Sequence, residues 1–225
     1  MSEHDFLDQL DADHVERLVQ LGRRRTHPPQ SILFFEGDVP HDVILVRRGD
    51  LKVSTVVDGR EVVLDVLGPG AIVGEVSAVD GRTRSATVTA LTTTEIVAIP
   101  AATFMDFLGQ HPVIALTLLR CMATRIRDAS RRQVEYGALD AVGRVCRRLV
   151  ELMDRYGHPV PGEATSAVRI DAPLTQGDIA AWAGLSREAV VKALHALRRL
   201  GWVATSSRAI TVLDVDAVVA RAAVT

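Results

Sequence analysis

The segment TQGDIAAWAGLSREAVVKALH, residues 175–195, most constrains the fold, because it predicts two short helices joined by a tight turn. Apolar or small residues recur at helical spacing in both halves, so each helix has one buried face. They are Ile179, Ala180, Ala183, Leu185, Val190, Ala193 and Leu194. Gly184 falls where the chain must turn sharply, and glycine adopts a positive φ there without steric cost. This layout is typical of a helix-turn-helix, whose second helix enters the major groove of DNA.

Polar residues begin and line the outer face of the second helix. Ser186 stands at its start, followed by Arg187, Glu188 and Lys192. The first turns of a recognition helix reach base edges, where these side chains supply donors and acceptors. The alternative is a solvated polar face. The pattern favours a DNA-binding regulator.

The composition is that of a globular protein of one large or two small domains. The chain has 225 residues, of which 48% are hydrophobic and 24% charged. No uncharged apolar run approaches the roughly 18–20 residues that span a bilayer. The N-terminus is acidic, which argues against a signal or transit peptide. We therefore expect a cytoplasmic protein without a membrane partner.

The net charge of −2 hides a difference between the two halves of the chain. Residues 1–137 hold 15 Lys and Arg against 19 Asp and Glu, whereas residues 138–225 hold 11 against 9. The modest positive balance of the second half agrees with attraction to phosphate.

Neither cysteines nor histidines indicate a metal site. Cys121 and Cys146 cannot supply four thiolates for a cluster, so we expect buried thiols in a reducing compartment. The seven histidines show no ligand spacing. Residues after 138 offer no nucleophile–base pair, metal ligands or acyl-CoA loop. We therefore predict no metal, no catalytic residue and no enzyme.

Periodicity divides the N-terminal half into a helix followed by many short strands. Residues 5–25 read as an amphipathic helix. Short β-branched runs separated by glycine-containing turns follow at 32–35, 43–46, 51–57, 61–66, 86–91 and 95–99. Asp58-Gly59 between two of them predicts a hairpin. This pattern favours a β-barrel or jelly roll.

A long helix is predicted from Pro112 to about Tyr136. One seam alternates spacings of three and four, formed by Leu119, Met122, Ile126, Ala129, Gln133 and Tyr136. Such a seam needs a partner, and a two-stranded dimer interface is the economical interpretation. The alternative is packing on the chain's own barrel, and both can hold along its length.

The C-terminal part reads as a winged helix-turn-helix. A break at 137–140, interpreted as a hinge, precedes a helix at 141–156, a strand at 167–170 and the helix-turn-helix. Residues 201–203 and 209–213 read as a wing, and 215–223 as a closing helix. The fold class is therefore α+β, with a barrel domain at 1–111, a dimerisation helix at 112–137 and a DNA-binding domain at 138–225.

A candidate anion pocket lies at 68–77 and 82–86. Gly74 leaves backbone N–H groups bare, Ser85 offers a hydroxyl, and Arg84 gives a charged fork suited to phosphate. Glu75 can accept hydrogen bonds from a sugar hydroxyl. Inside a barrel, this set would hold a small anionic sugar phosphate. The alternative is a structural Glu75–Arg84 ion pair.

The order of these parts resembles the superfamily of the cyclic-AMP receptor protein and the fumarate–nitrate regulator. The resemblance covers the N-terminal helix, FFEGD at 34–38, the GE…RSA pocket, the long helix, the hinge at Asp140 and the winged helix-turn-helix. It implies a jelly-roll cyclic-nucleotide-binding domain, a homodimer and a palindromic DNA site with half-sites similar to GTGA. It also implies RNA polymerase as a further partner.

The resemblance implies a role for each pocket residue. Gly74 and Glu75 match the residues that hold the ribose of cyclic AMP, and Arg84 and Ser85 match those that hold its cyclic phosphate. Val76 completes this part of the ligand site, although Val76-Ser77 departs from the family's small-residue pattern.

On the long helix, Ala129 and Ser130 fall where the cyclic-AMP-responsive member has a threonine and a serine facing adenine. Alanine cannot hydrogen-bond a base, whereas Ser130 remains and would reach the ligand across the dimer. One lost hydrogen bond costs about 0.5–1.5 kcal/mol. Such a loss weakens binding without abolishing it, and the residues that match the phosphate and ribose contacts are present. We therefore expect cAMP as the effector. The alternatives are a constitutive DNA-binding dimer, a dimer that answers another small molecule, and an enzyme regulated by a cyclic-nucleotide domain.

In the DNA half, the resemblance implies base contacts by Ser186, Arg187, Glu188 and Lys192. Lys192 stands where an arginine is usual and lacks the planar fork. Helix and wing contacts to phosphate complete the expected DNA-binding set, with Thr175, Gln176, Ser206, Ser207 and Arg208 as candidates. Thr175 also predicts a capping box with Asp178, which leaves a helix N-terminus for a backbone phosphate.

Overall fold

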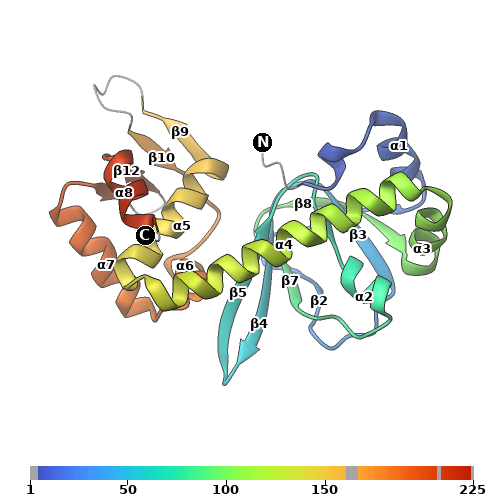
Figure 1. Ribbon diagram of the computed structural model, residues 1–225, viewed down its shortest axis with the longest axis horizontal. Coiled ribbons are helices and arrows are strands. Elements are labelled where there is room, and N and C mark those ends of the chain that lie inside the picture. Colours follow the sequence, from blue (N-terminus) through green and yellow to red (C-terminus); the bar gives the residue numbers. More distant parts are fainter. Residues whose placement is uncertain (1–4, 161–166, 207–208, 224–225) are drawn as a thin grey trace. The chain divides into compact units, whose positions relative to one another are not determined.

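The computed structural model describes residues 5–160, 167–206 and 209–223. The chain forms two compact units that divide between Asp128 and Ala129, within one long helix (Figure 1). Strands dominate the first unit, and helices around a small sheet form the second. The predicted α+β class is confirmed.

The first unit is a jelly roll of two antiparallel four-stranded sheets, ordered β1-β8-β3-β6 and β2-β7-β4-β5. Their strands are β1 (Arg23–His27), β2 (Ile32–Phe34), β3 (Asp42–Arg48), β4 (Leu51–Val57), β5 (Arg60–Leu67), β6 (Ile72–Val73), β7 (Thr87–Ala90) and β8 (Thr94–Pro100). All six predicted strands are present. The predicted hairpin at Asp58-Gly59 joins β4 to β5, and both residues have positive φ there.

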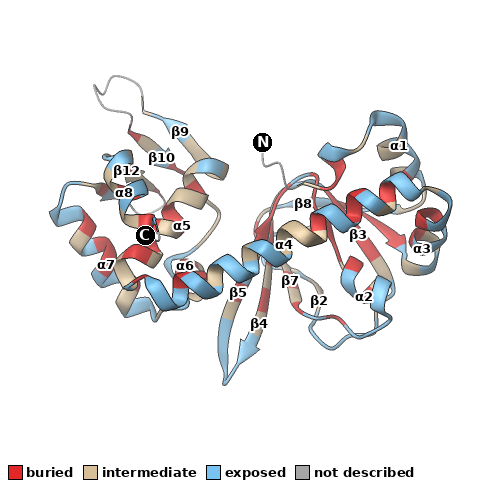
Figure 2. Cartoon of the chain, viewed as in Figure 1, coloured by how far each residue is buried: buried red, intermediate tan, exposed pale blue. Residues whose placement is uncertain are grey.

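Strand β3 shows why the unit has two cores. Ile44 and Val46 point between the sheets, whereas Val43 and Leu45 point to the opposite face, which helices cover. Side chains alternate between the two faces of a strand, and both faces of β3 are covered. Its apolar residues therefore follow one another without a break in the sequence. Figure 2 shows the buried residues in red along the inner strands.

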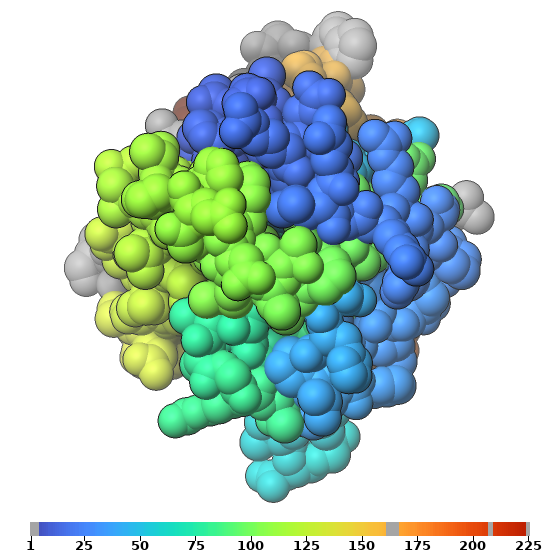
Figure 3. All heavy atoms as spheres, turned by 90° about the vertical axis from the view of Figure 1, so that its right-hand side faces the viewer, coloured from blue at the N-terminus to red at the C-terminus, as the bar shows by residue number. Residues whose placement is uncertain are grey.

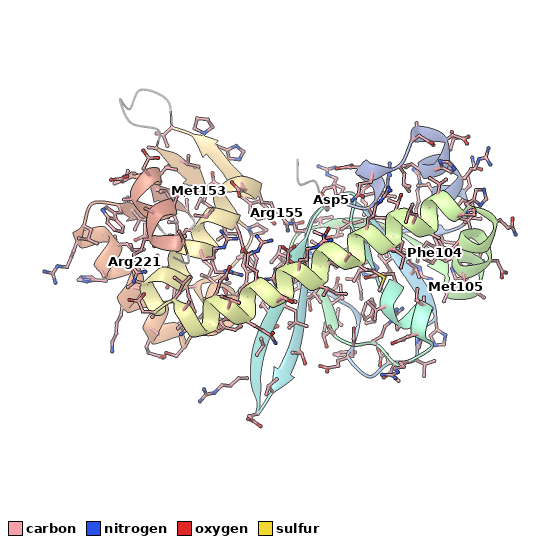
Figure 4. All side chains as sticks on the ribbon, in the orientation of Figure 1. Asp5, Phe104, Met105, Met153, Arg155 and Arg221 are labelled. Atoms are coloured by element: carbon pink, nitrogen blue, oxygen red, sulfur yellow. The ribbon has the colours of Figure 1, made fainter. Side chains whose placement is uncertain are left out.

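Helices cover the face of β3 that carries Val43 and Leu45, and with it they form the second core. They are η1 (Leu7–Gln9), α1 (Ala12–Gln20), α2 (Glu75–Asp80), α3 (Ala101–Gln110) and the first half of α4 (Pro112–Ala138). Phe104 of α3 is fully buried, while the adjacent Met105 is exposed; Figure 4 labels both. In Figure 3 the blue N-terminal segment lies directly against the green α3 and α4, which agrees with their shared core.

The prediction of one helix over 5–25 is wrong. Asp11 has extended backbone angles and its side chain accepts from the His14 N–H, so it caps a helix that begins at Ala12. That helix ends at Gln20, and Arg23–His27 pairs with β8 as an edge strand. Gly22 allows this change, since a Cβ there would lie 2.5 Å from Val97.

The long helix α4 uses its two faces differently. Ile114, Leu118 and Cys121 are buried in the second core, so part of the helix packs on its own barrel. Leu119 and Ile126, on the predicted seam, are 62% and 66% exposed. In the first half of α4, the helix face that carries Ile114, Leu118 and Cys121 therefore packs on the chain's own barrel, which was the alternative to a dimer seam.

The second unit contains the predicted winged helix-turn-helix. Its elements are the end of α4, α5 (Ala141–Tyr156), β9 (Gly157–Pro159), β10 (Val168–Ile170), α6 (Gln176–Ala183), α7 (Arg187–Arg199), β11 (Val203–Thr205), β12 (Ile210–Val212) and α8 (Val215–Ala222). The four strands form one antiparallel sheet in the order β11-β12-β10-β9. The sequence pattern does not predict β6, α2 or α3 in the first unit, and it does not predict β9 in the second.

Candidate ligand cavity and nucleic-acid interface

A cavity of about 150 Å³ lies in the jelly roll between the sheets and α4. It is lined by strands β2, β4, β5, β6 and β7, by the segments around α2 and 84–86, and by one arginine of α4. The lining residues are Phe34, Val53, Asp65, Leu67, Val73, Gly74, Glu75, Val76, Ser77, Arg84, Ser85, Ala86, Val88 and Arg125. The structure thus brings together five predicted ligand residues: Gly74, Glu75, Val76, Arg84 and Ser85.

The Arg84 guanidinium is buried and held by neutral oxygens. Its Nη1 donates to the Gly74 carbonyl at 3.0 Å and to Ser77 Oγ at 2.9 Å, and its Nη2 donates to the Asp42 carbonyl. The Phe34 ring lies 4.2 Å from its Cζ, a cation–π contact. Nε has no partner. Burial lowers the pKa of Arg84, and the carboxylates of Asp42, Glu75 and Asp38 only partly oppose this effect.

Glu75 is also buried, but its partner is Arg125 rather than Arg84. The Arg125 Nη1 lies 2.5 Å from Glu75 Oε1, and Nη2 donates to the Ile72 carbonyl at 2.7 Å. Burial is the largest single effect and acts to lower the pKa of Arg125, but the combined effects of Glu75, Cys121 and Asp65 raise it above its ordinary value. The structural ion pair considered between Glu75 and Arg84 is not formed among the described residues.

Sequence reasoning did not place Arg125 in the ligand site. Arg125 lies four residues before Ala129, hence on the same helix face one turn earlier, and this spacing was the available signal. Ala129 and Ser130 are exposed on α4, beyond the lining residues, which end at Arg125.

Gly74 is required for the approach of Arg84. Its φ of +83° lies in the left-handed region, and a Cβ there would lie 2.5 Å from Arg84 Nη1. Ser85 and Val76 are exposed at the rim, while Ser77 is buried below Arg84. Glycine therefore lets the guanidinium pack against the backbone of the turn.

The helix-turn-helix has the local chemistry that its sequence predicts. Thr175 Oγ1 accepts from the Asp178 N–H at 3.1 Å, and the Asp178 carboxylate accepts from the Thr175 N–H at 2.9 Å, so the capping box is confirmed. Gly184 ends α6 with a φ of +62°, and a Cβ there would lie 3.1 Å from Tyr136. Ser186 caps α7 by accepting from the Ala189 N–H.

The outer face of α7 presents its polar side chains to solvent. Arg187, Glu188 and Lys192 are exposed, while the opposite face is buried through Val190, Ala193, Leu194 and Leu197. The backbone N–H at the helix start, followed by the Ser186 hydroxyl, lowers the pKa of Glu188. Glu188 is therefore an ionised acceptor at neutral pH.

The remaining predicted phosphate contacts differ in how the structure describes them. Gln176 is the first residue of α6 and is exposed. Ser206 is exposed, but its hydroxyl bonds the Ala209 backbone and closes the turn of the wing. Ser207 and Arg208 lie outside the described residues.

No group of three potential metal ligands occurs in the described part of the chain. None of its helices is long and apolar enough to cross a membrane. Cys121 and Cys146 are both buried, as predicted.

Comparison with known proteins agrees with both halves of this description. Residues 24–111 match the cyclic nucleotide-binding domain, and residues 143–221 match the Crp-like helix-turn-helix domain. The "CRP-like cAMP-activated global transcriptional regulator" of Mycobacterium tuberculosis is 30% identical over 196 residues, which cover 87% of this chain and 86% of that protein. The "Cyclic AMP receptor protein" of Thermus thermophilus is 29% identical, with coverages of 86% and 85%.

The fold is shared with FixK2 of Bradyrhizobium japonicum, at a TM-score of 0.78 and 21% identity over 91% of this chain and 98% of that one. The fold and the two sites thus define a DNA-binding regulator with a cyclic-nucleotide-binding domain. The chain belongs to the CRP/FNR superfamily of transcriptional regulators.

Proposed function

We propose that the chain acts as a homodimer whose binding to DNA is controlled by cAMP held in the jelly-roll cavity. The observation that carries the effector is the Arg84 guanidinium, which is 5% exposed. It has no carboxylate partner among the described residues, and its Nε–H is unpaired. A buried cation with no carboxylate in direct contact is costly, and an anionic ligand would supply that contact.

Each part of the nucleotide has a counterpart in the cavity. The cyclic phosphate would lie against Arg84 and Ser85, with the backbone at Gly74 close by. A ribose hydroxyl would donate to Glu75, which Arg125 holds in place. The free volume of about 150 Å³ is below the ~300 Å³ at which small-molecule pockets usually begin, so binding requires lining side chains such as Val76 to move.

The choice of cAMP rests on the named activity of relatives and on α4. The relative from M. tuberculosis is named as cAMP-activated, and that from T. thermophilus as a cyclic AMP receptor. Ala129 and Ser130 follow Arg125 by one turn of α4, and in the proposed dimer they would meet the base. Ser130 would supply the hydrogen bond that Ala129 cannot.

The homodimer is supported by the uncovered seam of α4. Of the six seam residues, Leu119, Ile126, Ala129, Gln133 and Tyr136 are exposed in a single chain. Large apolar side chains repeated along one helix face lose contact with water when a second helix packs on them. The α4 helix of a second chain has the same repeat of apolar residues, so we propose that it packs on this seam. RNA polymerase stays a predicted further partner.

The proposed dimer would read a palindrome with its two copies of α7. Two-fold related recognition helices enter successive major grooves about 34 Å apart. Arg187 would donate to guanine O6 and N7, and Glu188 would accept from a cytosine amino group. Lys192 and Ser186 would add donors, and Thr175 and Gln176 would meet backbone phosphate through the start of α6.

The test combines titration calorimetry with DNA selection on the full chain. We expect heat on titration with cAMP at one site per chain, a dimer by analytical ultracentrifugation, and selection of palindromic duplexes similar to GTGA half-sites. Fluorescence anisotropy with the selected duplex should show tighter binding when cAMP is present. No heat with cAMP would contradict the effector, and failure to select any palindrome would contradict the mode of DNA reading.

Ala129 favours a second candidate, in which the dimer binds DNA constitutively or answers another small molecule. Because alanine offers the base no hydrogen bond, the adenine subsite is weaker by about 0.5–1.5 kcal/mol. Absence of heat with both cAMP and cGMP, together with DNA binding that neither changes, would support this candidate over the first.

A further inference from the structure

A buried charged cluster ties the last turn of α4 to α5. Glu135 of α4 is 3% exposed, and its carboxylate lies 2.9 Å from Arg147 Nε and 2.5 Å from Arg148 Nη2. Arg148 is itself buried, and its Nη1 has no partner. Burying opposite charges is tolerated only when they are closely paired, so the position of α5 depends on Glu135.

The same cluster reaches the helix-turn-helix. The Arg148 guanidinium lies 5.3 Å from the ring of Trp182 on α6. Arg144 of α5 lies over the ring of Tyr136 on α4 and donates to the carbonyl of Gly184 at 3.2 Å. Tyr136 in turn approaches Gly184 so closely that a Cβ there would lie 3.1 Å away. The end of α4 therefore contacts the turn between α6 and α7.

The far side of the α4–α5 junction is held as well. Asp140 caps α5 by accepting from the Gly143 N–H at 2.8 Å, and its carboxylate pairs with Arg221 of α8. Figure 4 shows Arg221 beside the start of α5. The Leu139 N–H donates to the Glu135 carbonyl at 2.9 Å, and Leu139 is buried. Residues 137–140, which the sequence marks as a hinge, are thus fixed on both sides.

We propose that Glu135 is a positioning residue that makes the last turns of α4 a rigid part of the DNA-binding unit. A rotation of the last turns of α4 would then carry α6 and α7 with it. The consequence for regulation rests on the proposed function. The rigidity of the junction does not, because every contact that supports it lies within one unit.

Hydrogen exchange of the full chain, without nucleotide or DNA, tests the rigidity. In the wild-type protein the amides of 137–139, which lie in or directly after the last turn of α4, should be protected to a similar degree as those inside α5. Glu135→Gln removes the bridging charge, and the exchange of the Leu139 amide should accelerate about tenfold or more. Wild-type amides at 137–139 that exchange as an unprotected chain would overturn the proposal.

Glu151→Gln is the matched control. Glu151 pairs with the same two arginines, at 3.7 Å from Arg147 and 3.1 Å from Arg148, but it lies on α5 itself. Its loss removes one carboxylate from the cluster without cutting the link between helices. We expect the Leu139 amide to change less than about twofold in this variant. Equal acceleration in both variants would contradict a bridging role for Glu135.

A double variant, Glu135→Leu with Arg148→Met, covers the case in which Glu135→Gln does not fold. Replacing a buried ion pair by apolar residues often keeps stability. A merely structural role predicts that thermal stability and Leu139 protection both recover. A positioning role predicts that stability recovers while the junction amides still exchange several-fold faster than in the wild type. Full recovery of protection would overturn the proposal, whatever calorimetry with cAMP shows.

Discussion

The guanidinium of Arg125 lies 2.5 Å from the buried carboxylate of Glu75, so an ion pair links the long helix α4 to the ligand cavity. The same guanidinium holds the Ile72 carbonyl at 2.7 Å, at the start of the short strand β6. Both partners belong to the jelly-roll unit. Any ligand that moves Glu75 therefore acts on α4 directly, without an intermediate element.

Arg125→Gln should lower the free energy of unfolding of the protein. It leaves the Glu75 carboxylate buried without its partner, a change that costs about 3–5 kcal/mol in a fully buried pair. Because Arg125 is 29% exposed, solvent screening reduces the expected loss to about 1–3 kcal/mol. Urea unfolding at fixed protein concentration measures it. Arg127→Gln, an exposed position on the same helix, should change stability by less than about 0.5 kcal/mol.

Arg84→Ala should abolish most binding of cyclic nucleotide while Arg82→Ala leaves it intact. Loss of charged hydrogen bonds to the phosphate corresponds to about 1.5–3 kcal/mol, or roughly 10–100-fold in affinity. Arg82 is exposed in the same segment and does not line the cavity, so it controls for removal of a positive charge. Titration calorimetry with cAMP measures both variants. If Arg84 is merely structural, stability should instead fall as much as affinity.

Gly184→Ala and Gly177→Ala should shift stability in opposite directions. At Gly184 the φ of +62° strains any side chain by about 1–2 kcal/mol, and the new Cβ would press on Tyr136 at 3.1 Å. At Gly177, inside α6, the nearest atom is Thr175 Oγ1 at 3.4 Å, and alanine gains about 0.5–1 kcal/mol over a helical glycine. Thermal unfolding of both variants measures the difference. Stabilisation by Gly184→Ala would contradict the described turn.

Local signals explain why most of the fold was predictable. Strands β3 to β5 alternate or run apolar between glycine turns, and both helices of the helix-turn-helix carry their own caps. Strand β1, Arg23–His27, has almost no buried side chain and pairs only along one edge, so it carries no apolar period. The sequence could not reveal that strand, because its backbone pairing alone defines it.

The ligand site also has a part that could be predicted from local sequence and a part that could not. Gly74, Glu75, Arg84 and Ser85 lie within one short stretch, so their chemistry could be predicted together. The partner of Glu75 lies 50 residues away on α4, and the partners of Glu135 lie on the next helix. Pairing between distant elements depends on packing, which the spacing of one segment does not encode.

Asp140→Ala should destabilise the protein in a way that depends on pH. The Gly143 N–H, and then Arg221, hold the pKa of Asp140 below its ordinary value of 3.8. A depressed folded-state pKa contributes stability above 3.8 that is lost as the pH falls through the lower folded value. The variant should therefore lose about 1 kcal/mol at neutral pH, as for a helix N-cap, and approach the wild type only below pH 3.8, as the pH falls through the folded-state pKa of Asp140.

Denaturant unfolding at several pH values measures the Asp140 effect. Asp154→Ala is the matched control, since Asp154 is an exposed aspartate of the same helix α5. Its effect should stay within about 0.5 kcal/mol at every pH. A difference between wild type and Asp140→Ala that grows toward acid would be incompatible with a depressed pKa.

Arg187→Ala should weaken binding to a selected duplex and relax its sequence preference at one base pair. Arg187 is exposed on the first turn of α7, where a bidentate contact to guanine contributes about 1–3 kcal/mol. Arg199→Ala, at the last turn of the same helix, removes an equal charge far from the helix start. It should weaken all duplexes alike and reduce the salt dependence slightly.

Anisotropy titrations on the selected duplex, on single-base variants and on random DNA separate the two effects of Arg187. If Arg187 reads a base, its loss narrows the gap between the selected duplex and one particular single-base variant, while random DNA is bound nearly as before. If it only meets phosphate, Arg187→Ala and Arg199→Ala should behave alike on every duplex, since phosphate contacts carry no sequence information. Equal weakening on selected and random DNA would remove Arg187 from the base-reading set.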